Sequence, residues 1–329
     1  MSHKLKITPQ LSRREFLAVG AGLLVSAAGS PTARATERVR IGLATRTWFP
    51  SVIAKTAVDL GLFKKEGIGA ELTIYQSGAE ALTAMAAGAA DVIASSPAVV
   101  VVGRQRGVAC RIVGSYTTGN FGWHLMVLLD SNISDASQLG GKKVGITTAG
   151  SLSDALALWT MQDKGVKFTT VPVGGGGLVP NLIARNLAAA VVYSPLSFQV
   201  MQNKEGRSIL DYGKAMPAHL NSGWAALDKF IANNRELLQK TLNALYGGLV
   251  FLQKNREEAI QIIAKVNDIS KNVASQEFEE VFLKLSPDGY MDLKLAEKAL
   301  ELARIAGITA LTDAKDIFTR EIAPIPTQA

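Results

Sequence analysis

Cysteine is nearly absent from this sequence, because Cys110 is the only one among 329 residues. A single cysteine excludes an intramolecular disulfide framework and any zinc or iron–sulfur site that needs several cysteines. Histidine is also scarce: His124 and His219, the two beyond the N-terminal segment, are far apart and lack a partner at metal-ligand spacing. We therefore expect no metal and no cofactor. No Gly-x-Ser-x-Gly elbow occurs either, so nothing supports a serine hydrolase.

The sequence carries little excess charge once its N-terminus is set aside. The formal net charge is +7, with 19% charged and 48% apolar residues. Residues 1–35 contain five basic residues and one acidic residue, a net charge of +4, so the remainder carries 7 − 4 = +3. Such a small charge spread over the remaining chain does not make a phosphate-binding surface, so we expect no nucleic-acid partner. The apolar content excludes a disordered or collagen-like chain, and the length suits about two domains.

The N-terminal segment has the features of a cleaved signal. Residues 16–28 form an apolar run of 13 residues. As a helix this run is about 20 Å long, too short for a hydrocarbon core of about 30 Å. Ala33-Arg34-Ala35 places small residues where a signal peptidase recognises them, so we expect cleavage after Ala35. No cysteine lies near this site, which excludes a lipid anchor, and no later apolar run predicts a membrane span.

Ser12-Arg13-Arg14-Glu15-Phe16-Leu17 resembles the twin-arginine export signal at every defined position. The resemblance implies that the twin-arginine translocase is a partner during export and that the mature protein works in the periplasm. An ordinary secretory peptide with two chance arginines is the alternative, and it leads to the same compartment.

Beyond the signal, β-rich runs alternate with helical periodicity. The pattern predicts strands at 39–43, 71–75, 91–94, 111–115, 123–129, 143–147, 168–171 and 189–193, with helices between them. From 234 to about 306 the pattern is helical only. Alternation of this kind builds mostly parallel sheets, so we expect an α/β protein of two lobes with a helical C-terminal region. No low-complexity linker separates the lobes, which predicts two extended crossings, near 123–129 and 215–227.

Hydroxyl groups and aromatic rings gather where the predicted strands end. Ligands of open α/β sheets bind beyond the carboxyl ends of the strands, and helix N-termini located there favour an anionic group. The candidate ligand-binding residues of this kind are Thr47, Ser77, Ser95, Ser96, Tyr116, Thr148, Ser151, Tyr193 and Ser194. Helix capping is the alternative for Ser77, Ser96 and Ser151, since serine is a common N-cap.

Four consecutive glycines, 174–177, lie between a predicted strand and a predicted helix. No Gly-Lys-Ser/Thr follows them, and their spacing is not Gly-x-Gly-x-x-Gly, so a nucleotide fingerprint is not indicated. Two interpretations stay open. The run is either a flexible turn that lets the next helix pack tightly, or a segment whose backbone N–H groups line a ligand cleft, with Gly175 as the candidate.

Several segments occur in an order that is known from one family. They are Arg40-Ile-Gly42, Gly61-Leu-Phe-Lys-Lys-Glu-Gly67, Ala81 to Gly88 followed by Ala90-Asp91-Val92, and Leu139-Gly-Gly-Lys-Lys-Val-Gly145 followed by Gly150-Ser151. In these segments the chain, from residue 39 to about 306, resembles the solute-binding proteins of ABC importers of the nitrate/sulfonate/taurine type.

The resemblance implies a two-lobed periplasmic-binding-protein fold of type II. Lobe 1 would comprise 36–122 and 224–329, and lobe 2 would comprise 123–223. A small, anionic organic solute, such as a sulfonate, a carboxylate or a nitrate-type anion, would be enclosed between the lobes by hinge closure. The protein, as a monomer, would deliver the solute to a membrane permease without changing any bond of it, and so would not be an enzyme.

The same resemblance implies roles for further residues. Trp48, Phe49, Trp123 and Tyr193 would form apolar walls, and Arg46 would clamp the anionic group. A solvated loop charge is the alternative for Arg46, and hinge or core packing is the alternative for Trp48 and Trp123. The chain departs from the family at 188–195, where Ala188 and Ser194 replace acidic residues. The change at Ser194 removes a negative charge beside the expected cleft.

Two other functions remain open on the sequence. A ligand-sensing receptor for a membrane sensor kinase would share every feature above. A thiamine-pyrimidine-synthase-like enzyme is disfavoured, because such enzymes carry a cysteine-rich segment and an active-site histidine, whereas only Cys110 is present here.

Overall fold

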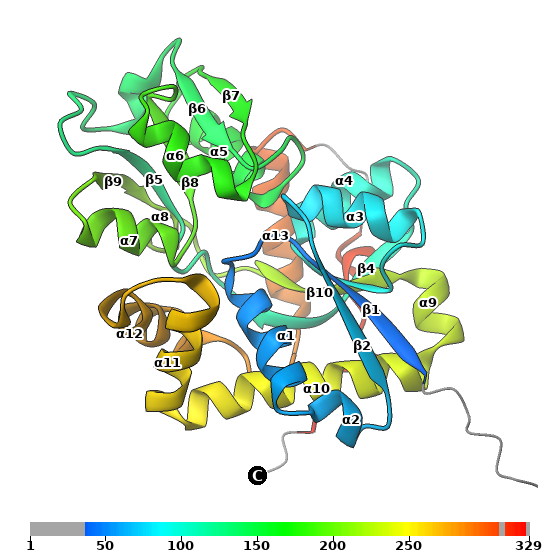
Figure 1. Ribbon diagram of the computed structural model, residues 1–329. Coiled ribbons are helices and arrows are strands. Elements are labelled where there is room, and N and C mark those ends of the chain that lie inside the picture. Colours follow the sequence, from blue (N-terminus) through cyan, green and yellow to red (C-terminus); the bar gives the residue numbers. More distant parts are fainter. Residues whose placement is uncertain (1–36, 309–312, 327–329) are drawn as a thin grey trace, which may run out of the picture. The chain divides into compact units, whose positions relative to one another are not determined.

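A computed structural model describes residues 37–308 and 313–326, so the expected export signal and its cleavage site lie outside the described residues. The described chain builds two five-stranded sheets, each flanked by helices, and a helical C-terminal region (Figure 1). This is the α/β architecture that the alternating pattern predicts. No helix within the described ranges is long and apolar enough to cross a membrane.

The first sheet has the order β2-β1-β3-β10-β4. Its strands are β1 (Arg38–Leu43), β2 (Gly69–Ile74), β3 (Val92–Ser95), β4 (Cys110–Thr117) and β10 (Ser222–Leu227). The helices that belong with it are α1 (Phe49–Asp59), α2 (Leu62–Lys65), α3 (Gly78–Ala86), α4 (Pro97–Gln105), α9 (Asp228–Asn233) and α14 (Ala314–Ile317). We call this sheet with these helices the first lobe.

The second sheet has the order β7-β6-β8-β5-β9. Its strands are β5 (His124–Leu128), β6 (Lys143–Ile146), β7 (Thr169–Pro172), β8 (Ala189–Val192) and β9 (Gly206–Asp211). Its helices are the 3-10 turns η1 (Ala136–Leu139) and η2 (Gly175–Gly177) and the helices α5 (Leu152–Asp163), α6 (Leu178–Ile183), α7 (Leu196–Gln202) and α8 (Tyr212–Ala215). This sheet with these helices is the second lobe.

Each sheet is mostly parallel but contains one reversed strand. β10 pairs antiparallel with β3 and β4, and β5 pairs antiparallel with β8 and β9, while the remaining pairings are parallel. The reversed strand is in both cases the first one after the chain passes from one lobe to the other. The passages themselves are 118–123 and 216–221. The second lies within the expected crossing at 215–227, whereas strand β5 takes up most of the expected crossing at 123–129.

Strand β9 is an element that the sequence pattern does not reveal. Its residues, Gly206 to Asp211, are mostly half-buried and mix charged with apolar side chains, because β9 is an edge strand beside β5. Without a clean alternation of buried and exposed positions, period-two patterning gives no signal.

The C-terminal region is helical, as expected, and packs mainly on the first lobe. It comprises α10 (Arg235–Lys254), α11 (Arg256–Asn267), α12 (Lys271–Glu280), η3 (Phe282–Lys284) and α13 (Leu293–Ile305). The long helix α10 lies along α1, and its buried leucines recur at helical spacing. Helix α13 contacts α4 of the first lobe and α5 of the second (Figure 1).

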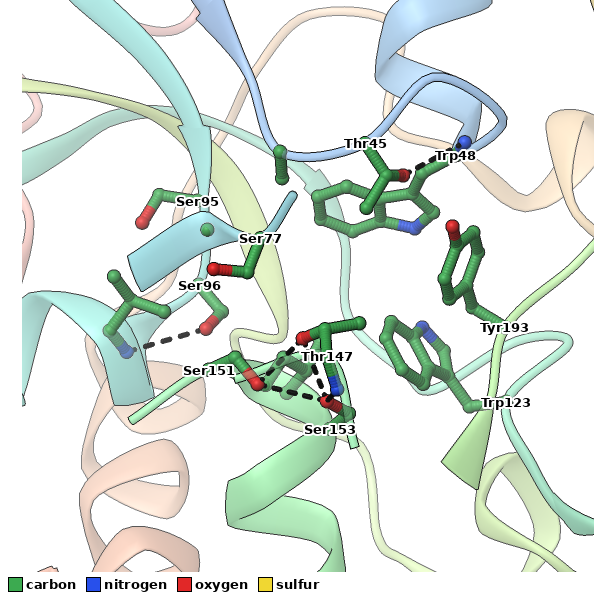
Figure 2. A pocket seen from close by; sticks show the side chains of 14 residues that line it. Thr45, Trp48, Ser77, Ser95, Ser96, Trp123, Thr147, Ser151, Ser153 and Tyr193 are labelled. Carbon is green, nitrogen blue, oxygen red and sulfur yellow. Dashed lines mark hydrogen bonds between the residues drawn. The ribbon is translucent and has the colours of Figure 1, made fainter. Parts of the chain in front are cut away.

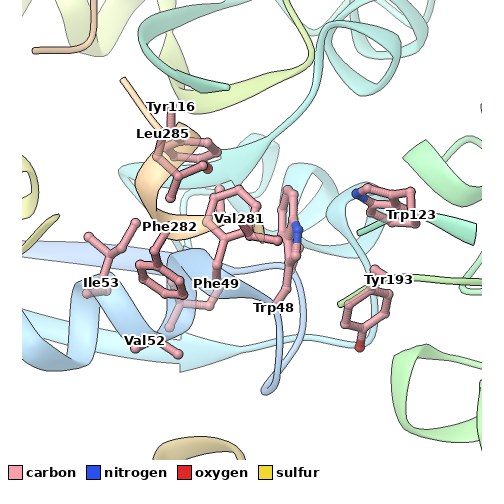
Figure 3. Close-up of a cluster of buried hydrophobic side chains, with 14 of the residues drawn as sticks. Trp48, Phe49, Val52, Ile53, Tyr116, Trp123, Tyr193, Val281, Phe282 and Leu285 are labelled. Carbon is pink, nitrogen blue, oxygen red and sulfur yellow. The ribbon is translucent and has the colours of Figure 1, made fainter. Parts of the chain in front are cut away.

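A buried aromatic cluster connects α1 with the sheet edge that carries the site. Phe49 packs edge to face against Tyr116 at a centroid distance of 5.4 Å and against Phe282 of η3 at 6.4 Å. Tyr116 in turn packs against Trp224 of β10 at 5.2 Å. Figure 3 shows this cluster continuing through Trp48 towards the pocket described below. The cluster therefore fixes the start of α1 and, with it, the loop that precedes the helix.

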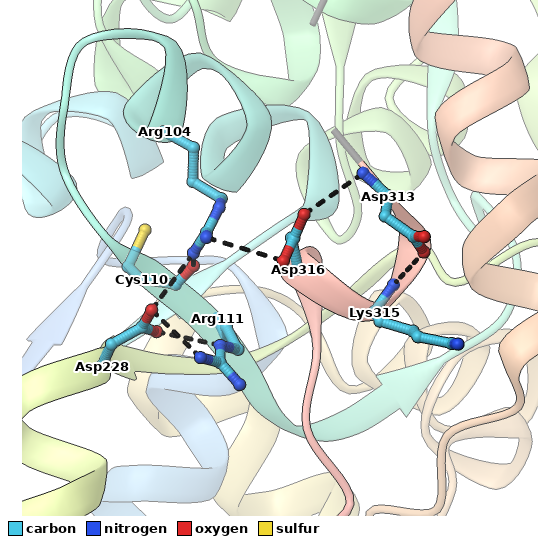
Figure 4. Close-up of polar contacts among 7 residues, drawn as sticks. All are labelled: Arg104, Cys110, Arg111, Asp228, Asp313, Lys315 and Asp316. Atoms are coloured by element: carbon cyan, nitrogen blue, oxygen red, sulfur yellow. Dashed lines mark hydrogen bonds and ion pairs between the residues drawn. The ribbon is translucent and has the colours of Figure 1, made fainter. Parts of the chain in front are cut away.

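An ion-pair network holds the C-terminal helix α14 near the edge strand β4. Asp228 lies 3.3 Å from Arg104 Nη1 and 3.0 Å from Arg111 Nε, and Arg104 also approaches Asp316 of α14 (Figure 4). Cys110 beside them is fully buried, and burial raises the pKa of its thiol to about 12. The cysteine is thus a protonated, inert core side chain.

Candidate functional site

A small pocket lies between the two sheets, at the carboxyl ends of β1, β3, β6 and β8 (Figure 2). Both lobes line it, with Ala44, Thr45, Trp48, Ser77, Gly78, Ser95, Ser96 and Val99 from the first lobe, Thr147, Ser151, Leu152, Ser153 and Tyr193 from the second, and Trp123 from the first passage. About 30 Å³ is open to the centres of water-sized molecules, which is room for roughly two waters. A larger solute can enter only if the lobes or their side chains move.

Three helix N-termini meet at this pocket. Ser77, Ser96 and Ser151 are the N-caps of α3, α4 and α5, and each side-chain oxygen accepts a backbone N–H three residues later, at 3.1, 3.4 and 3.3 Å respectively. These serines therefore cap their helices and also line the pocket, and their role in ligand binding stays a prediction. The first N–H groups of a helix have no partner within the helix, so each terminus presents a partial positive charge to the pocket.

Hydroxyl groups form a network on the side of the second lobe. Thr147, Ser151 and Ser153 lie pairwise within 2.9 Å through their side-chain oxygens, and Ser153 also accepts the N–H of Thr147. This network positions the loop after β6 against the start of α5. It gives the pocket several groups that can both donate and accept a hydrogen bond.

Aromatic rings make the opposite wall. Trp123 lies 6.3 Å from Trp48 and 5.4 Å from Tyr193, measured between ring centroids. The Tyr193 hydroxyl is 3.2 Å from Thr47 Oγ1 of the first lobe. Burial raises the pKa of Tyr193, so its phenol stays neutral. Figure 2 shows the Tyr193 ring between Trp123 and the segment that carries Thr45 and Trp48.

None of the described residues that line the pocket carries a formal charge. Arg46 follows Thr45 directly, but its side chain is exposed, and Nη1 lies 3.5 Å from the Val266 carbonyl oxygen of α11. Asp154 in α5 accepts the N–H of Gly150, and burial raises the pKa of its carboxyl. The electrostatic character of the pocket therefore comes from helix dipoles and hydroxyl groups.

The pocket contains half of the residues that the sequence proposes. Those that line it are Trp48, Ser77, Ser95, Ser96, Trp123, Ser151 and Tyr193. Those that do not are Arg46, Thr47, Phe49, Tyr116, Thr148, Gly175 and Ser194. Of these, Phe49 and Tyr116 belong to the aromatic cluster behind Trp48. Ser194 is buried beside Gly122 of the passage and near Glu277 of α12.

Thr47, Thr148 and Gly175 instead join the two lobes around the pocket. Thr148 Oγ1 donates to Ser77 Oγ at 2.7 Å, and the Gly175 N–H donates to the Gln76 carbonyl at 3.1 Å. Together with the Thr47–Tyr193 contact, these bonds connect loops of different sheets. We call these contacts the closure contacts.

Seven lining residues are not among the candidates that the sequence proposes, namely Ala44, Thr45, Gly78, Val99, Thr147, Leu152 and Ser153. Thr45 and Thr147 were within reach, because each is a hydroxyl residue at the end of a predicted strand. Ser153 carried no such signal, since it is the second residue of α5 and looks like an ordinary helical position. The described residues contain no group of three or more His, Cys, Asp or Glu that could hold a metal ion.

Comparison with known proteins gives a family and a fold. The family model described as NMT1/THI5 like matches residues 51–259, which is more than half of the chain. A "putative binding protein" of Brucella abortus (strain 2308) is 24% identical over 330 residues, and the alignment covers 94% of this chain and 98% of that protein.

Solved structures share the fold at low identity. The periplasmic aliphatic sulphonate binding protein SsuA from Escherichia coli matches with a TM-score of 0.69 and 18% identity, covering 89% of this chain and 94% of that one. The periplasmic nitrate-binding protein NrtA from Synechocystis PCC 6803 matches with a TM-score of 0.66 and 16% identity, covering 85% and 84%. The desulfurization enzyme DSZB also matches, with a TM-score of 0.58 and 13% identity over 82% of this chain and 93% of that one. The fold therefore does not decide between binding and catalysis.

Proposed function

Because the chain belongs to the NMT1/THI5-like family, we propose that it is the solute-binding component of an ABC importer and captures a small solute with an anionic group. The pocket between the two sheets is the proposed binding site. The bound solute stays chemically unchanged, because the polar groups of the pocket are hydroxyls held in caps and networks. None of them is paired with a base that would activate it as a nucleophile.

The convergence of three helix N-termini on an uncharged pocket carries this proposal. Each terminus is equivalent to about half a positive charge, and a buried anion gains up to about 2 kcal/mol from one such end. Serine and threonine hydroxyls can donate further hydrogen bonds to oxygens of the anion. A cation would face three positive dipole ends with no carboxylate to balance it. The site therefore selects for negative charge.

The aromatic wall complements the anionic end. Trp48, Trp123 and Tyr193 offer apolar faces for the remainder of an organic solute. Sulfonates and carboxylates combine these two requirements, and a nitrate-type anion meets the first. We place the anionic group at the N-termini of α3, α4 and α5, and the apolar part against the rings.

Hinge closure is the proposed mechanism of capture. The pocket takes its lining from both lobes, so a solute gains its full set of contacts only when the lobes are together, and it shifts the population towards that state. The passages 118–123 and 216–221 are the proposed hinges. The two parts that move relative to each other are the lobes that the family resemblance implies. Lobe 1 comprises 36–122 and 224–329, and lobe 2 comprises 123–223.

The remaining steps concern the cell rather than the pocket. After export by the twin-arginine translocase and cleavage behind Ala35, the mature monomer works in the periplasm and delivers its solute to a membrane permease. The Ser12–Leu17 motif supports the export step, and membership in the family supports the delivery step.

A thermal-shift screen followed by calorimetry tests the proposal. Methanesulfonate, taurine, acetate, nitrate and a pyrimidine serve as probes, and protonated ethylamine serves as the cationic control. We expect at least one anionic probe to raise the melting temperature and to be recovered unchanged by mass spectrometry. Binding of ethylamine in preference to all the anions, or no binding of any probe, contradicts the proposal.

A further inference from the structure

The glycine run 174–177 does not line the pocket, and its first two residues lie against the first lobe. Gly175 is buried, and its N–H donates to the carbonyl of Gln76, the residue before the cap of α3. Gly175 follows β7 of the second lobe, whereas Gln76 follows β2 of the first. The run therefore provides one of the closure contacts at the rim of the pocket.

At position 175 the space between the two lobes is sufficient only for glycine. A Cβ atom on Gly175 would lie 2.6 Å from Thr45 Cγ2 of the first lobe and 2.7 Å from the Tyr193 hydroxyl of its own lobe. Both distances are shorter than any ordinary carbon contact.

Neither neighbour can move aside easily. Thr45 is buried and its hydroxyl accepts the N–H of Trp48, so rotation of the side chain breaks that bond. Tyr193 is also buried, with its ring against Trp123 and its hydroxyl beside Thr47. Relief of the contact with Thr45 therefore requires the two lobes to separate, whereas relief of the contact with Tyr193 requires a shift within the second lobe.

We propose that Gly175 is a positioning residue for solute binding: its missing side chain lets the second lobe close onto Gln76 and Thr45, and a larger residue holds the lobes apart. Thr45 and Tyr193 line the pocket, so a change at 175 is transmitted directly to its walls. The effect on solute affinity rests on the proposed function, whereas the effect on closure does not.

The neighbouring glycine supplies a matched control. A Cβ on Gly176 meets no atom within 4 Å, and Gly176 belongs to the same 3-10 turn. Gly174 is less suitable because its φ of +69° strains any other residue, and Gly177 would press on Val173 of its own lobe. Gly175→Ala and Gly176→Ala therefore add the same methyl group to the same turn. Only the methyl group at 175 would collide with Thr45 and Tyr193.

A disulfide trap measures closure without any solute. Ser77→Cys with Thr148→Cys replaces two hydroxyls that lie 2.7 Å apart across the lobes, and the native Cys110 is buried and does not compete. The rate of disulfide formation under mild oxidation then reports how often the lobes meet. We expect Gly175→Ala to slow this rate about tenfold or more, and Gly176→Ala to leave it unchanged.

Each alternative outcome overturns the inference. Equal rates in both variants, or slowing in both, would show that Gly175 is not the closing contact. Adding Thr45→Ser to Gly175→Ala removes the methyl group that collides, so it should restore part of the rate. No recovery would show that Thr45 is not the obstacle.

Affinity gives the second measurement. With a probe that binds the original protein in the screen above, Gly175→Ala should raise the Kd about tenfold, and Gly176→Ala should leave it unchanged. An unchanged Kd overturns the inference even though the proposed function stands. If no probe binds the original protein, the proposed function fails, and the cross-linking rates alone decide about Gly175.

Discussion

The hydroxyl of Thr148 donates a 2.7 Å hydrogen bond to the hydroxyl of Ser77, and this bond joins the loop after β6 to the cap of α3. Ser77 also accepts the N–H of Glu80, so one serine oxygen serves both its own helix and the opposite lobe. The bond lies next to the pocket and is one of the closure contacts. Its loss should therefore affect binding more than folding.

Thr148→Val tests that expectation, because valine keeps the shape of threonine and removes only the hydroxyl. A hydrogen bond of this kind contributes about 0.5–1.5 kcal/mol, so the Kd of a bound probe should rise about two- to tenfold. Thr83→Val is the control, since the Thr83 hydroxyl bonds to Ala79 within α3. Calorimetry on both variants measures the difference. Equal affinities in the two variants would show that the Thr148–Ser77 bond does not contribute to the bound state.

Ser96→Asp tests the sign of charge that the pocket selects. Aspartate is a good N-cap, so α4 should remain stable, but its carboxylate occupies the pocket and repels an anion. We expect the affinity for an anionic probe to fall about a hundredfold or more, since like charges in a buried site cost several kcal/mol. Ser270→Asp makes the same exchange at the cap of α12, which does not line the pocket, and should leave the Kd unchanged. An affinity of the anionic probe for the Ser96→Asp variant that is unchanged or higher would contradict the placement of the anionic group at the start of α4.

Arg46→Ala separates two interpretations of the only arginine in the loop between β1 and α1. The exposed side chain and its long contact with Val266 favour a solvated loop charge over a clamp. Removing it should change the Kd of an anionic probe less than about twofold, the size expected for an exposed charge outside the pocket. A tenfold loss in calorimetry at moderate salt would restore Arg46 to the binding site.

The sequence is sufficient to predict the alternation of strands and helices, but it does not predict in which direction the side chains of the loops point. Thr45, Arg46, Thr47 and Trp48 follow one strand, and all four could face a cleft. In the structure Phe49 packs against Tyr116, Thr45 and Trp48 line the pocket, and Arg46 is exposed. These directions depend on tertiary packing.

Long-range packing also explains the outcome at Gly175 and Ser194. The sequence leaves Gly175 open as either a turn or a cleft residue, and in the structure Gly175 contacts the other lobe through Gln76, which belongs to a distant segment. Ser194 replaces an acidic residue of the family pattern, and the structure places a carboxyl group from α12, that of Glu277, near it. Local patterns carry no information about such partners, because they are fixed by tertiary structure.

Glu277 predicts how stability depends on pH. Its carboxyl is fully buried, and neither oxygen has a hydrogen-bond partner among the described residues. Burial raises the pKa of Glu277 from 4.5 to about 8, although the nearby Ser194 hydroxyl lowers it in part. Between pH 4.5 and about 8, the folded state therefore keeps the proton of Glu277, whereas the unfolded state has lost it. Its contribution is fully present below pH 4.5 and is lost as the pH rises to about 8.

Urea unfolding of the original protein and of Glu277→Gln at pH 5 and pH 8.5 measures this effect. The free energy of unfolding of the original protein should fall, relative to the glutamine variant, by a few kcal/mol between the two pH values. The exposed Glu258→Gln on α11 is the control and should follow the original protein. If Glu277→Gln and the original protein lose stability in parallel, the carboxyl is ionised in the folded state and the prediction is wrong.

Two adjacent glycines of α10 test the packing of this helix on α1. A Cβ on Gly248 would lie 2.9 Å from the backbone oxygen of Ile53 and 3.1 Å from Ala57 Cβ, whereas a Cβ on Gly247 would meet only the flexible end of Leu62, at 3.2 Å. Alanine improves helix propensity at both positions by about 1 kcal/mol. We therefore expect Gly247→Ala to leave the free energy of unfolding unchanged or to raise it. Gly248→Ala should lower it by about 1–3 kcal/mol, because backbone atoms of α1 cannot yield as a side-chain end can. Equal stability of the two variants in urea unfolding would mean that α10 can move away from α1 at little cost, and that the first lobe is less rigidly supported than its packing indicates.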